Sequence, residues 1–197
     1  MCSEKMKGYN LEIIFDTYDE FENFEIEKMS RQIIIPENTT MYELHIIIQI
    51  LFGLNNRKDY EFSYDDIMSE KVVTHGYIPH RRFCSTHEDM DRIYLDSFFR
   101  KKISFDYEYD YCSEWCFIVR YHKTVEYDKY YATILNYTGD YNIVENCGGP
   151  WGLEYYLKVI NNPPKKLSKH DSEMIKKFEK FDIEKTQEKL KSIFDMV

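Results

Sequence analysis

The 197-residue sequence predicts an α+β fold in which a sheet forms from the first part of the chain and helices dock on it from the C-terminal part. Three observations predict this class. Several segments carry apolar side chains at every second position, which is typical of half-buried strands. An early capping-box pattern precedes a helical apolar stripe. Beyond residue 150, capping residues precede further apolar stripes, so the chain is expected to end in helices.

The chain opens with two strands and a helix. Residues 9–17 alternate and predict the first strand. Residues 31–35 predict a second strand that Pro36 stops, because proline cannot donate a hydrogen bond to a ladder. Thr40 and Glu43 have the capping-box spacing and predict the start of a helix. The apolar stripe of that helix consists of Leu44, Ile47, Ile48 and Leu51.

The middle of the chain predicts three more strands. Residues 59–64 alternate, residues 65–92 show no clear pattern, and residues 103–110 and 115–121 alternate again. The short connection between the last two segments predicts a hairpin. Its first strand is expected to turn inward Ile103, Phe105, Tyr107 and Tyr109, and to turn outward Asp106, Glu108 and Asp110.

Helices are predicted for the rest of the chain. Residues 150–160 form the first, Ser168 caps a second that runs to about residue 178, and Asp182 caps the last. The roughly 30 residues after Pro163–Lys166 are too few for an independent domain without a disulfide or metal staple. We therefore expect one domain over residues 1–197, with residues 165–197 as a docked helical extension.

Composition restricts the class of protein. The net charge is −9 with a pI near 5.2, which argues against nucleic-acid binding over the whole surface, since phosphate attraction needs positive charge. The five cysteines lack a Cys-x-x-Cys pair and are expected to be free thiols. No segment approaches the roughly 20 apolar residues of a membrane helix, and the N-terminus lacks a hydrophobic signal region. We expect a cytoplasmic protein with no membrane association.

The segment 145–157 has the most distinctive pattern. Gly148 and Gly149 permit a turn that other residues resist, and Pro150 suits the first position of a helix. We expect at least one of these glycines to adopt positive φ. We also expect Trp151 to be buried against the sheet near Trp115. The helical stripe behind the turn consists of Leu153, Tyr156, Leu157 and Ile160.

Two of these motifs together resemble the plasmid pRiA4b ORF-3-like family, whose members occur on plasmids and beside insertion-sequence transposases. The first is the hairpin Tyr107-Glu108-Tyr109-Asp110-Tyr111 with Trp115, and the second is the turn Cys147-Gly148-Gly149-Pro150-Trp151-Gly152. The resemblance runs over most of the chain. Further matches are Tyr9-Asn10-Leu11-Glu12-Ile13, the helix with Leu44-His45, and Phe181-Asp182-Ile183-Glu184.

The resemblance implies a roll-like fold, with a mixed, mostly antiparallel curved sheet and helices packed on one side, and a mobile-element setting without an established activity. The chain departs from the family at ionisable positions, since Lys58 and Tyr60 replace a His-x-His pair. Acid–base and metal chemistry need particular ionisable groups, so the retained residues resemble a folding signature. That structural signature comprises His45, Tyr107, Trp115, Cys147, Gly148, Gly149 and Gly152, and the polar positions that survive are Arg31, His45, Asp110 and Glu145.

Three carboxylates on the predicted hairpin form the first candidate site. Asp106, Glu108 and Asp110 are two residues apart, which places them on one face of a strand. They could bind a divalent cation or a partner, or they could form the ordinary solvent face of a half-exposed sheet. The full candidate binding set is Asp106, Glu108, Asp110, Tyr111, Glu145 and Trp151.

Two other groups of residues have side chains suited to metal binding or nucleophilic chemistry, but we favour an ordinary structural role for both. One is a group of zinc-binding residue types whose spacings of five, four and three match no zinc-finger pattern: His75, His80, Cys84 and His87. The other is the Cys147 thiol before a predicted helix, paired with His45 or His122 as a reactive nucleophile. We expect no metal and no cofactor.

The function that these observations favour is non-enzymatic binding, through an acidic, aromatic surface that engages a protein partner. A basic protein or a nucleic-acid-binding protein is the candidate partner. Direct nucleic-acid binding is the alternative and would use lysines of the C-terminal helices. These are Lys165, Lys166, Lys169, Lys176 and Lys177. A metal-dependent hydrolase built on Asp110 and Glu145 is a third reading.

Overall fold

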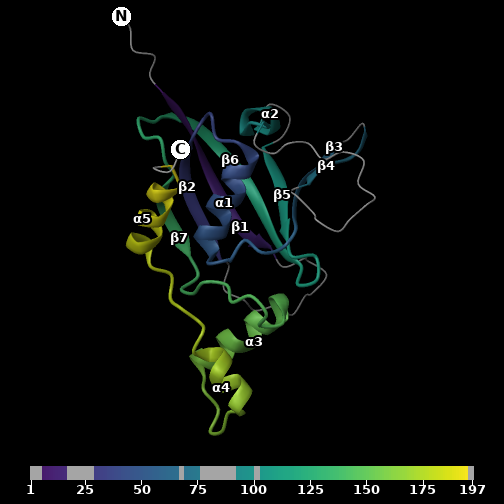
Figure 1. The fold of residues 1–197 in the computed structure, drawn as a ribbon, viewed down its shortest axis with the longest axis vertical. Helices are drawn as coiled ribbons and strands as arrows, with labels where there is room; N and C mark the ends of the chain where they lie inside the picture. Colours follow the sequence, from purple (N-terminus) through teal and green to yellow (C-terminus); the bar gives the residue numbers. More distant parts are fainter. Residues whose placement is uncertain (1–5, 17–28, 67–68, 76–91, 100–102, 195–197) are drawn as a thin grey trace, which may run out of the picture.

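The structure is a computed structural model that describes residues 6–16, 29–66, 69–75, 92–99 and 103–194 (Figure 1). Its described residues form one seven-stranded sheet and five helices, so the α+β class is confirmed. None of the described helices is both long and apolar enough to cross a membrane. The strands are β1 (Lys7–Asp16), β2 (Ser30–Pro36), β3 (Tyr60–Asp66), β4 (Ser69–His75), β5 (Ser104–Tyr109), β6 (Trp115–Glu126) and β7 (Thr133–Thr138). The helices are α1 (Met41–Phe52), α2 (Leu95–Phe99), α3 (Gly149–Asn161), α4 (Lys169–Ile175) and α5 (Ile183–Phe194).

The sheet has the order β4-β3-β5-β6-β1-β2-β7. All its neighbouring strands within the described residues pair antiparallel, so the expected mixed sheet has no parallel pair in this part of the chain. The long central pair β1–β6 carries a bulge after Asn10, which shifts the register opposite His122. β4, β7 and α2 were not predicted from the sequence.

Helix α1 lies across one face of the sheet (Figure 1). The Thr40 side chain accepts a hydrogen bond from the Glu43 N–H and the Glu43 side chain accepts from the Thr40 N–H, so the predicted capping box is confirmed. Gly53 ends the helix with φ 75°, a left-handed conformation that glycine adopts without strain. The helix buries the stripe that the sequence predicted, and the core beneath it is rich in aromatic rings.

The hairpin of β5 and β6 forms with the predicted inward face, since Phe105, Tyr107 and Tyr109 are buried. Its ends differ from the prediction. Ile103 was expected to point inward but lies outside β5 and is 72% exposed. Asp110 was expected to be the last residue on the solvent face of the strand. The strand instead ends at Tyr109, and Asp110, with φ 57°, turns the chain. The three predicted carboxylates therefore do not share one face.

The C-terminal helices occupy two places. α5 lies beside the edge strand β7, where the Gln187 side chain accepts a hydrogen bond from the Ile134 N–H at 2.9 Å and donates to the Ala132 carbonyl at 2.8 Å. This amide satisfies edge groups that would otherwise be open to another strand. α3 and α4 instead lie beyond one end of the sheet (Figure 1). The predicted caps Ser168 and Asp182 both accept backbone hydrogen bonds at their helix starts.

Buried Arg31 ties the α5 side of the molecule to the core. Its guanidinium donates to the carbonyls of Leu51, Ser30, Thr138 and Tyr141. It also lies over the Phe181 ring, 3.9 Å from its centroid. Burial lowers the pKa of Arg31 to about 10, which still leaves it charged at neutral pH. Arg31, one of the polar family positions that survive in this chain, thus joins β2 to β7, α1 and the segment before α5.

Candidate functional site

A closed ring of four polar residues, joined by three side chains and both the side chain and main-chain N–H of Asn56, lies between α1 and the sheet. Gln49 Nε2 donates to the Tyr107 hydroxyl at 2.8 Å, and that hydroxyl lies 2.7 Å from His45 Nδ1. His45 Nε2 lies 2.7 Å from Asn56 Oδ1, and the Asn56 N–H donates to Gln49 Oε1 at 2.9 Å. His45, Gln49 and Tyr107 are buried, so the ring satisfies polar groups that would be costly to leave unpaired.

The ring determines the state of His45. Asn56 Oδ1 can only accept, so the neutral imidazole carries its proton on Nε2 and accepts from the Tyr107 hydroxyl through Nδ1. Burial lowers the pKa of His45 to about 4, although its hydrogen bond to Asn56 acts in the opposite direction. The imidazole also stacks on the Tyr60 ring with centroids 3.5 Å apart. His45 is therefore neutral and held in place at physiological pH.

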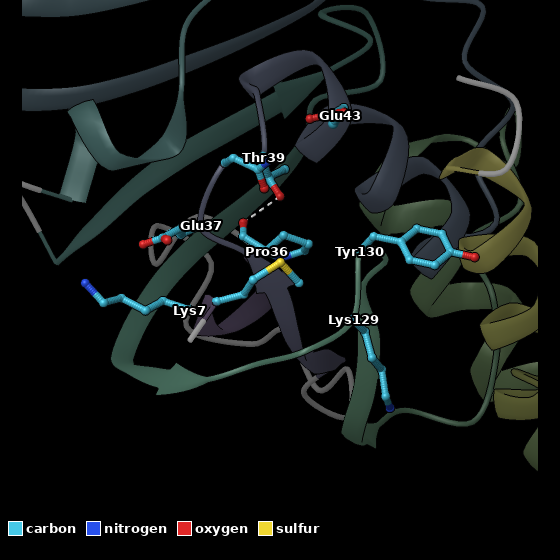
Figure 2. A pocket seen from close by; sticks show the side chains of 9 residues that line it. Lys7, Pro36, Glu37, Thr39, Glu43, Lys129 and Tyr130 are labelled. Atoms are coloured by element: carbon cyan, nitrogen blue, oxygen red, sulfur yellow. Dashed lines mark hydrogen bonds between the residues drawn. The ribbon is translucent and has the colours of Figure 1, made fainter. Parts of the chain in front are cut away.

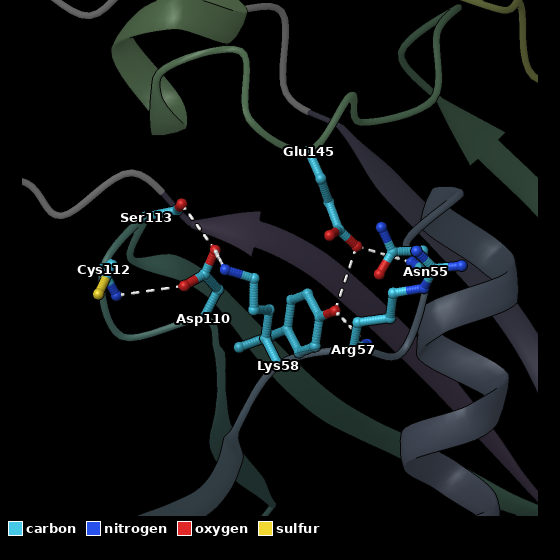
Figure 3. A network of polar contacts seen from close by, with 8 residues as sticks. Asn55, Arg57, Lys58, Asp110, Cys112, Ser113 and Glu145 are labelled. Carbon is cyan, nitrogen blue, oxygen red and sulfur yellow. Dashed lines mark hydrogen bonds and ion pairs between the residues drawn. The ribbon is translucent and has the colours of Figure 1, made fainter.

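A second group of contacts surrounds Glu145, from the loop before α3 (Figure 3). Its Oε1 accepts from the Asn55 N–H at 2.6 Å and from the Tyr109 hydroxyl at 3.1 Å. The same hydroxyl accepts from the Arg57 N–H at 3.0 Å. Burial and the nearby Glu145 carboxylate raise the pKa of Tyr109. Glu145 thus joins the loop after α1 to the end of β5.

Asp110 stabilises the hairpin turn (Figure 3). Its carboxylate accepts from the Cys112 N–H at 3.3 Å and from the Ser113 hydroxyl at 2.8 Å. Lys58 Nζ lies 3.7 Å from Asp110 Oδ2, and the carboxylate is only 6% exposed. A short polar side chain that bonds its own turn is the usual way for an aspartate to hold positive φ. Asp110 is therefore not part of a solvent-facing acidic strip.

We call these residues the polar network: His45, Gln49, Asn55, Asn56, Arg57, Lys58, Tyr107, Tyr109, Asp110 and Glu145. Three of the four polar family positions that survive in this chain belong to it, namely His45, Asp110 and Glu145. The fourth, Arg31, bonds elsewhere. In the described part of the chain, no three His, Cys, Asp or Glu side chains gather closely enough to cage a metal ion. The suspected zinc-type residues His80, Cys84 and His87, and the side chain of His75, lie outside the described residues.

The glycine turn before α3 packs on the same hairpin. Gly148 has φ 103° and Gly149 has φ 67°, which confirms the expectation of positive φ. A Cβ on Gly149 would lie 2.8 Å from the Ser113 carbonyl oxygen, so a larger residue does not fit. Cys147 is buried, and burial raises the pKa of its thiol to about 11. This disfavours the reactive-thiol interpretation, because the thiolate is the nucleophile.

The outward face of β5 retains the other two predicted carboxylates. Asp106 is exposed and Glu108 is half-buried. The register places Glu108 directly opposite Glu61 of β3, and Asp106 opposite Ser63. Tyr111, another predicted residue, donates a hydrogen bond to Glu61 Oε2 at 3.0 Å. The structure thus brings Tyr111 to this acidic face, whereas Glu145 belongs to the polar network.

Trp151 overturns one expectation. It was predicted to be buried near Trp115, but it is 51% exposed, whereas Trp115 is fully buried. The sequence contained the signal: the stripe that starts at Leu153 fills one face of α3, and Trp151 falls on the opposite face. Tyr155, one turn further on, was overlooked for the same reason and is 48% exposed.

Two cavities in the described part of the molecule lie away from the predicted site residues. A cavity of about 430 Å³ lies between the start of β1, the β2–α1 turn and the β6–β7 connection (Figure 2). In the figure, Lys7 and Lys129 extend in different directions from it, while Thr39 is held by a 2.7 Å hydrogen bond to the Pro36 carbonyl. A neighbouring cavity of about 270 Å³ also includes Lys7 and Glu37. None of the residues predicted for a site lines either cavity.

Comparisons with known proteins agree with this fold. The chain is similar to a protein of unknown function from Methanosarcina mazei Go1, whose crystal structure matches with a TM-score of 0.69 and 20% identity. The match covers 91% of this chain and 97% of the other, and at this identity it shows the fold alone. No curated protein matches the sequence. The family model described as plasmid pRiA4b ORF-3-like protein matches residues 22–189, so the chain belongs to the plasmid pRiA4b ORF-3-like family.

Proposed function

We propose that this chain is a non-enzymatic binding protein whose acidic sheet face engages a basic region of a protein partner. The acidic face comprises Glu61, Asp106 and Glu108, with Tyr111 at its end. We further propose that it acts as a single domain in the cytoplasm, in the mobile-element setting that the family name implies.

The polar network supports a structural role better than a catalytic one. A general base must be free to take a proton and must have a pKa suited to the working pH. His45 Nδ1 already accepts from Tyr107, and protonation of the buried imidazole is disfavoured near neutral pH. Asp110 bonds its own turn and Glu145 bonds two elements. The hydrolase alternative built on Asp110 and Glu145 would have to break these contacts.

The observation that carries the proposal is the register of β3 and β5. It places the carboxylates of Glu61 and Glu108 opposite each other, with Asp106 two residues along the same face. Like charges directly opposite on a sheet do not favour folding. They do create a concentrated negative strip on rigid strands. On its other side the strip borders Ile118 of β6, so an apolar side chain lies beside the carboxylates.

A charge-reversal pair tests this proposal. Asp106→Lys inverts an exposed charge on the acidic face, and Glu188→Lys makes the same change at an exposed position of α5. Both proteins would be used as bait in lysate of the native host, and bound proteins would be quantified by mass spectrometry. We expect a basic partner that wild type and Glu188→Lys retain and that Asp106→Lys recovers at least about tenfold less, or about 1.4 kcal/mol.

Two controls make the result decisive. Thermal melting of Asp106→Lys should match wild type, because a half-exposed strand tolerates polar exchange on its solvent face. The complex should weaken as salt rises, since exposed charges are screened beyond about 8 Å at physiological ionic strength. Equal recovery of every bound protein by the two variants would refute the proposal.

A further inference from the structure

The part of the chain beyond the sheet differs in charge from the rest. Residues 149–180, which we call the α3–α4 lobe, contain seven lysines and four carboxylates, in a chain whose net charge is −9. Figure 1 shows α3 and α4 beyond the end of the sheet, away from α1 and α5. The lobe is thus a locally basic surface on an acidic protein.

Each of the four carboxylates of the lobe has an ion-pair or hydrogen-bond partner. Glu154 Oε1 lies 2.7 Å from Lys158 Nζ, and the Asp171 carboxylate accepts hydrogen bonds from the hydroxyls of Ser168 and Tyr156. Glu173 Oε1 lies 4.0 Å from Lys169 Nζ, and Glu179 Oε2 lies 3.7 Å from Nζ of Lys185 in α5. The remaining lysines are exposed and form no ion pair within the described part of the chain: Lys165, Lys166, Lys176, Lys177 and Lys180.

The exposed face of α3 adds aromatic surface to this charge. Trp151 and Tyr155 are one helical turn apart and are 51% and 48% exposed. The opposite face of α3 packs on α4 and the residues after it, because the Tyr156 hydroxyl donates to Asp171 of α4 at 3.2 Å and the Tyr156 ring lies 5.7 Å from that of Phe178. The aromatic pair therefore belongs to the same packed unit as the exposed lysines that precede and follow α4.

We propose that the α3–α4 lobe binds single-stranded nucleic acid, with bases stacking on Trp151 and Tyr155 and lysines contacting phosphates. Stacking platforms beside basic residues are the usual means of sequence-tolerant binding to single strands. Duplex DNA hides its base faces, so the aromatic pair favours an unpaired strand. A lipid surface fits less well, because interfacial helices need a broad apolar face with basic residues. This site uses other elements than the acidic sheet face, so either proposal can fail alone.

Titration with oligothymidylate tests the site directly. The chain has two tryptophans, and Trp115 is fully buried, so a change in tryptophan emission reports Trp151. We expect emission quenching and fluorescence-polarisation binding tighter than micromolar at low salt. If about four phosphates are contacted, the plot of log affinity against log salt should have a slope of about −3. Duplex DNA of equal length should bind more weakly.

Matched variants locate the site. Trp151→Ala should weaken binding about 5- to 150-fold, the range for losing one stacked base, whereas Tyr130→Ala, at another exposed aromatic, should not. Lys165→Glu with Lys166→Glu should weaken binding at least about tenfold and flatten the salt slope. Lys123→Glu with Lys189→Glu is the matched charge control at exposed positions outside the lobe. All variants should melt within a few degrees of wild type.

Four outcomes would overturn the proposal. They are no binding at low salt, equal loss of affinity in the control lysine pair, binding without any change in Trp151 emission, and a preference for polyglutamate or anionic vesicles over oligothymidylate. The last outcome would assign the lobe to an acidic protein or to a membrane.

Discussion

The polar network and the α3–α4 lobe place residues from different family motifs, and the residues next to them, in opposite environments. In the polar network, Tyr107 and His45 are fully buried and each bonds other members of the ring. In the lobe, Trp151 and Tyr155 present about half of their surface to solvent. The difference teaches that belonging to a family motif does not fix a residue's role. Residues fixed by internal hydrogen bonds stabilise the fold, whereas residues on the outer face of a docked helix keep about half of their surface exposed.

The two tryptophans give the largest expected contrast. Trp115→Ala empties a fully buried site and should lower the free energy of unfolding by about 3–5 kcal/mol, because it creates a large cavity. Trp151→Ala should change it by no more than about 0.5 kcal/mol, as at most surface sites. Urea denaturation followed by circular dichroism measures both. Similar losses in the two variants would show that the lobe is part of the same cooperative core and would break the comparison.

The pH dependence of stability separates the regions next. The pKa of His45 is lowered to about 4 in the folded state, against about 6.5 when exposed. Between these values the unfolded chain binds a proton that the folded chain does not, so stability falls as pH decreases from about 6.5 to 4. The loss at the acidic limit is up to about 3 kcal/mol.

Denaturation curves across this pH window, for wild type and His45→Gln, isolate the contribution of His45. The variant is less stable at neutral pH, but its stability should decline less between pH 6.5 and pH 4. Parallel curves for the two proteins would mean that His45 is readily protonated in the folded state. The conclusion that the ring holds a neutral imidazole would then be wrong.

Removing one hydroxyl from each region has a smaller effect. Tyr107→Phe leaves His45 Nδ1 and a Gln49 N–H without their buried partner, and should cost about 1–3 kcal/mol. Tyr155→Phe removes a hydroxyl from a half-exposed ring and should stay within about 0.5 kcal/mol. Chemical denaturation of the pair sharpens the comparison because the substitution is identical. A neutral Tyr107→Phe would indicate that water or a rearranged ring replaces the lost hydrogen bonds.

Thiol labelling, which need not change stability, tests the junction of the two regions. Burial raises the pKa of Cys147 to about 11, so at pH 8 only about one thiol in a thousand is ionised. Cys112 is exposed on the hairpin turn. Peptide mapping after brief alkylation should find Cys112 modified well before Cys147. Rapid modification of Cys147 would reveal an open turn and would restore the reactive-thiol interpretation.

Several features of the fold could be predicted from the sequence because they depend on local chemistry. The Thr40–Glu43 capping box, the positive φ of the paired glycines and the β5–β6 hairpin all formed as expected. Each depends on residues within a few positions of one another. β7 was missed because it is a short strand with four exposed residues, Leu135, Asn136, Tyr137 and Thr138, so alternation is weak there.

The candidate site was predicted less well because it depends on contacts between distant segments. The sequence identified Asp110, Glu145 and His45 as notable, but it could not show that Glu145 bonds Asn55, ninety residues away. It also could not show that Asp110 leaves the strand to bond its own turn. The acidic face arose from the register of β3 on β5, which adds Glu61 to the predicted carboxylates.

By itself, the sequence determined the α+β class, the capped helices and the acidic net charge, since these follow from composition, periodicity and short-range spacing. It also determined the family, through the resemblance of its hairpin and glycine-turn motifs. Only the tertiary structure decided which motif residues are buried and hydrogen-bonded within the fold and which face solvent. Burial and hydrogen-bond partners are properties of packed surfaces, and α3 shows this most directly. Tyr156 on its inward face contacts Asp171 of α4 and Phe178 beyond it, and Trp151 and Tyr155 lie on the outside.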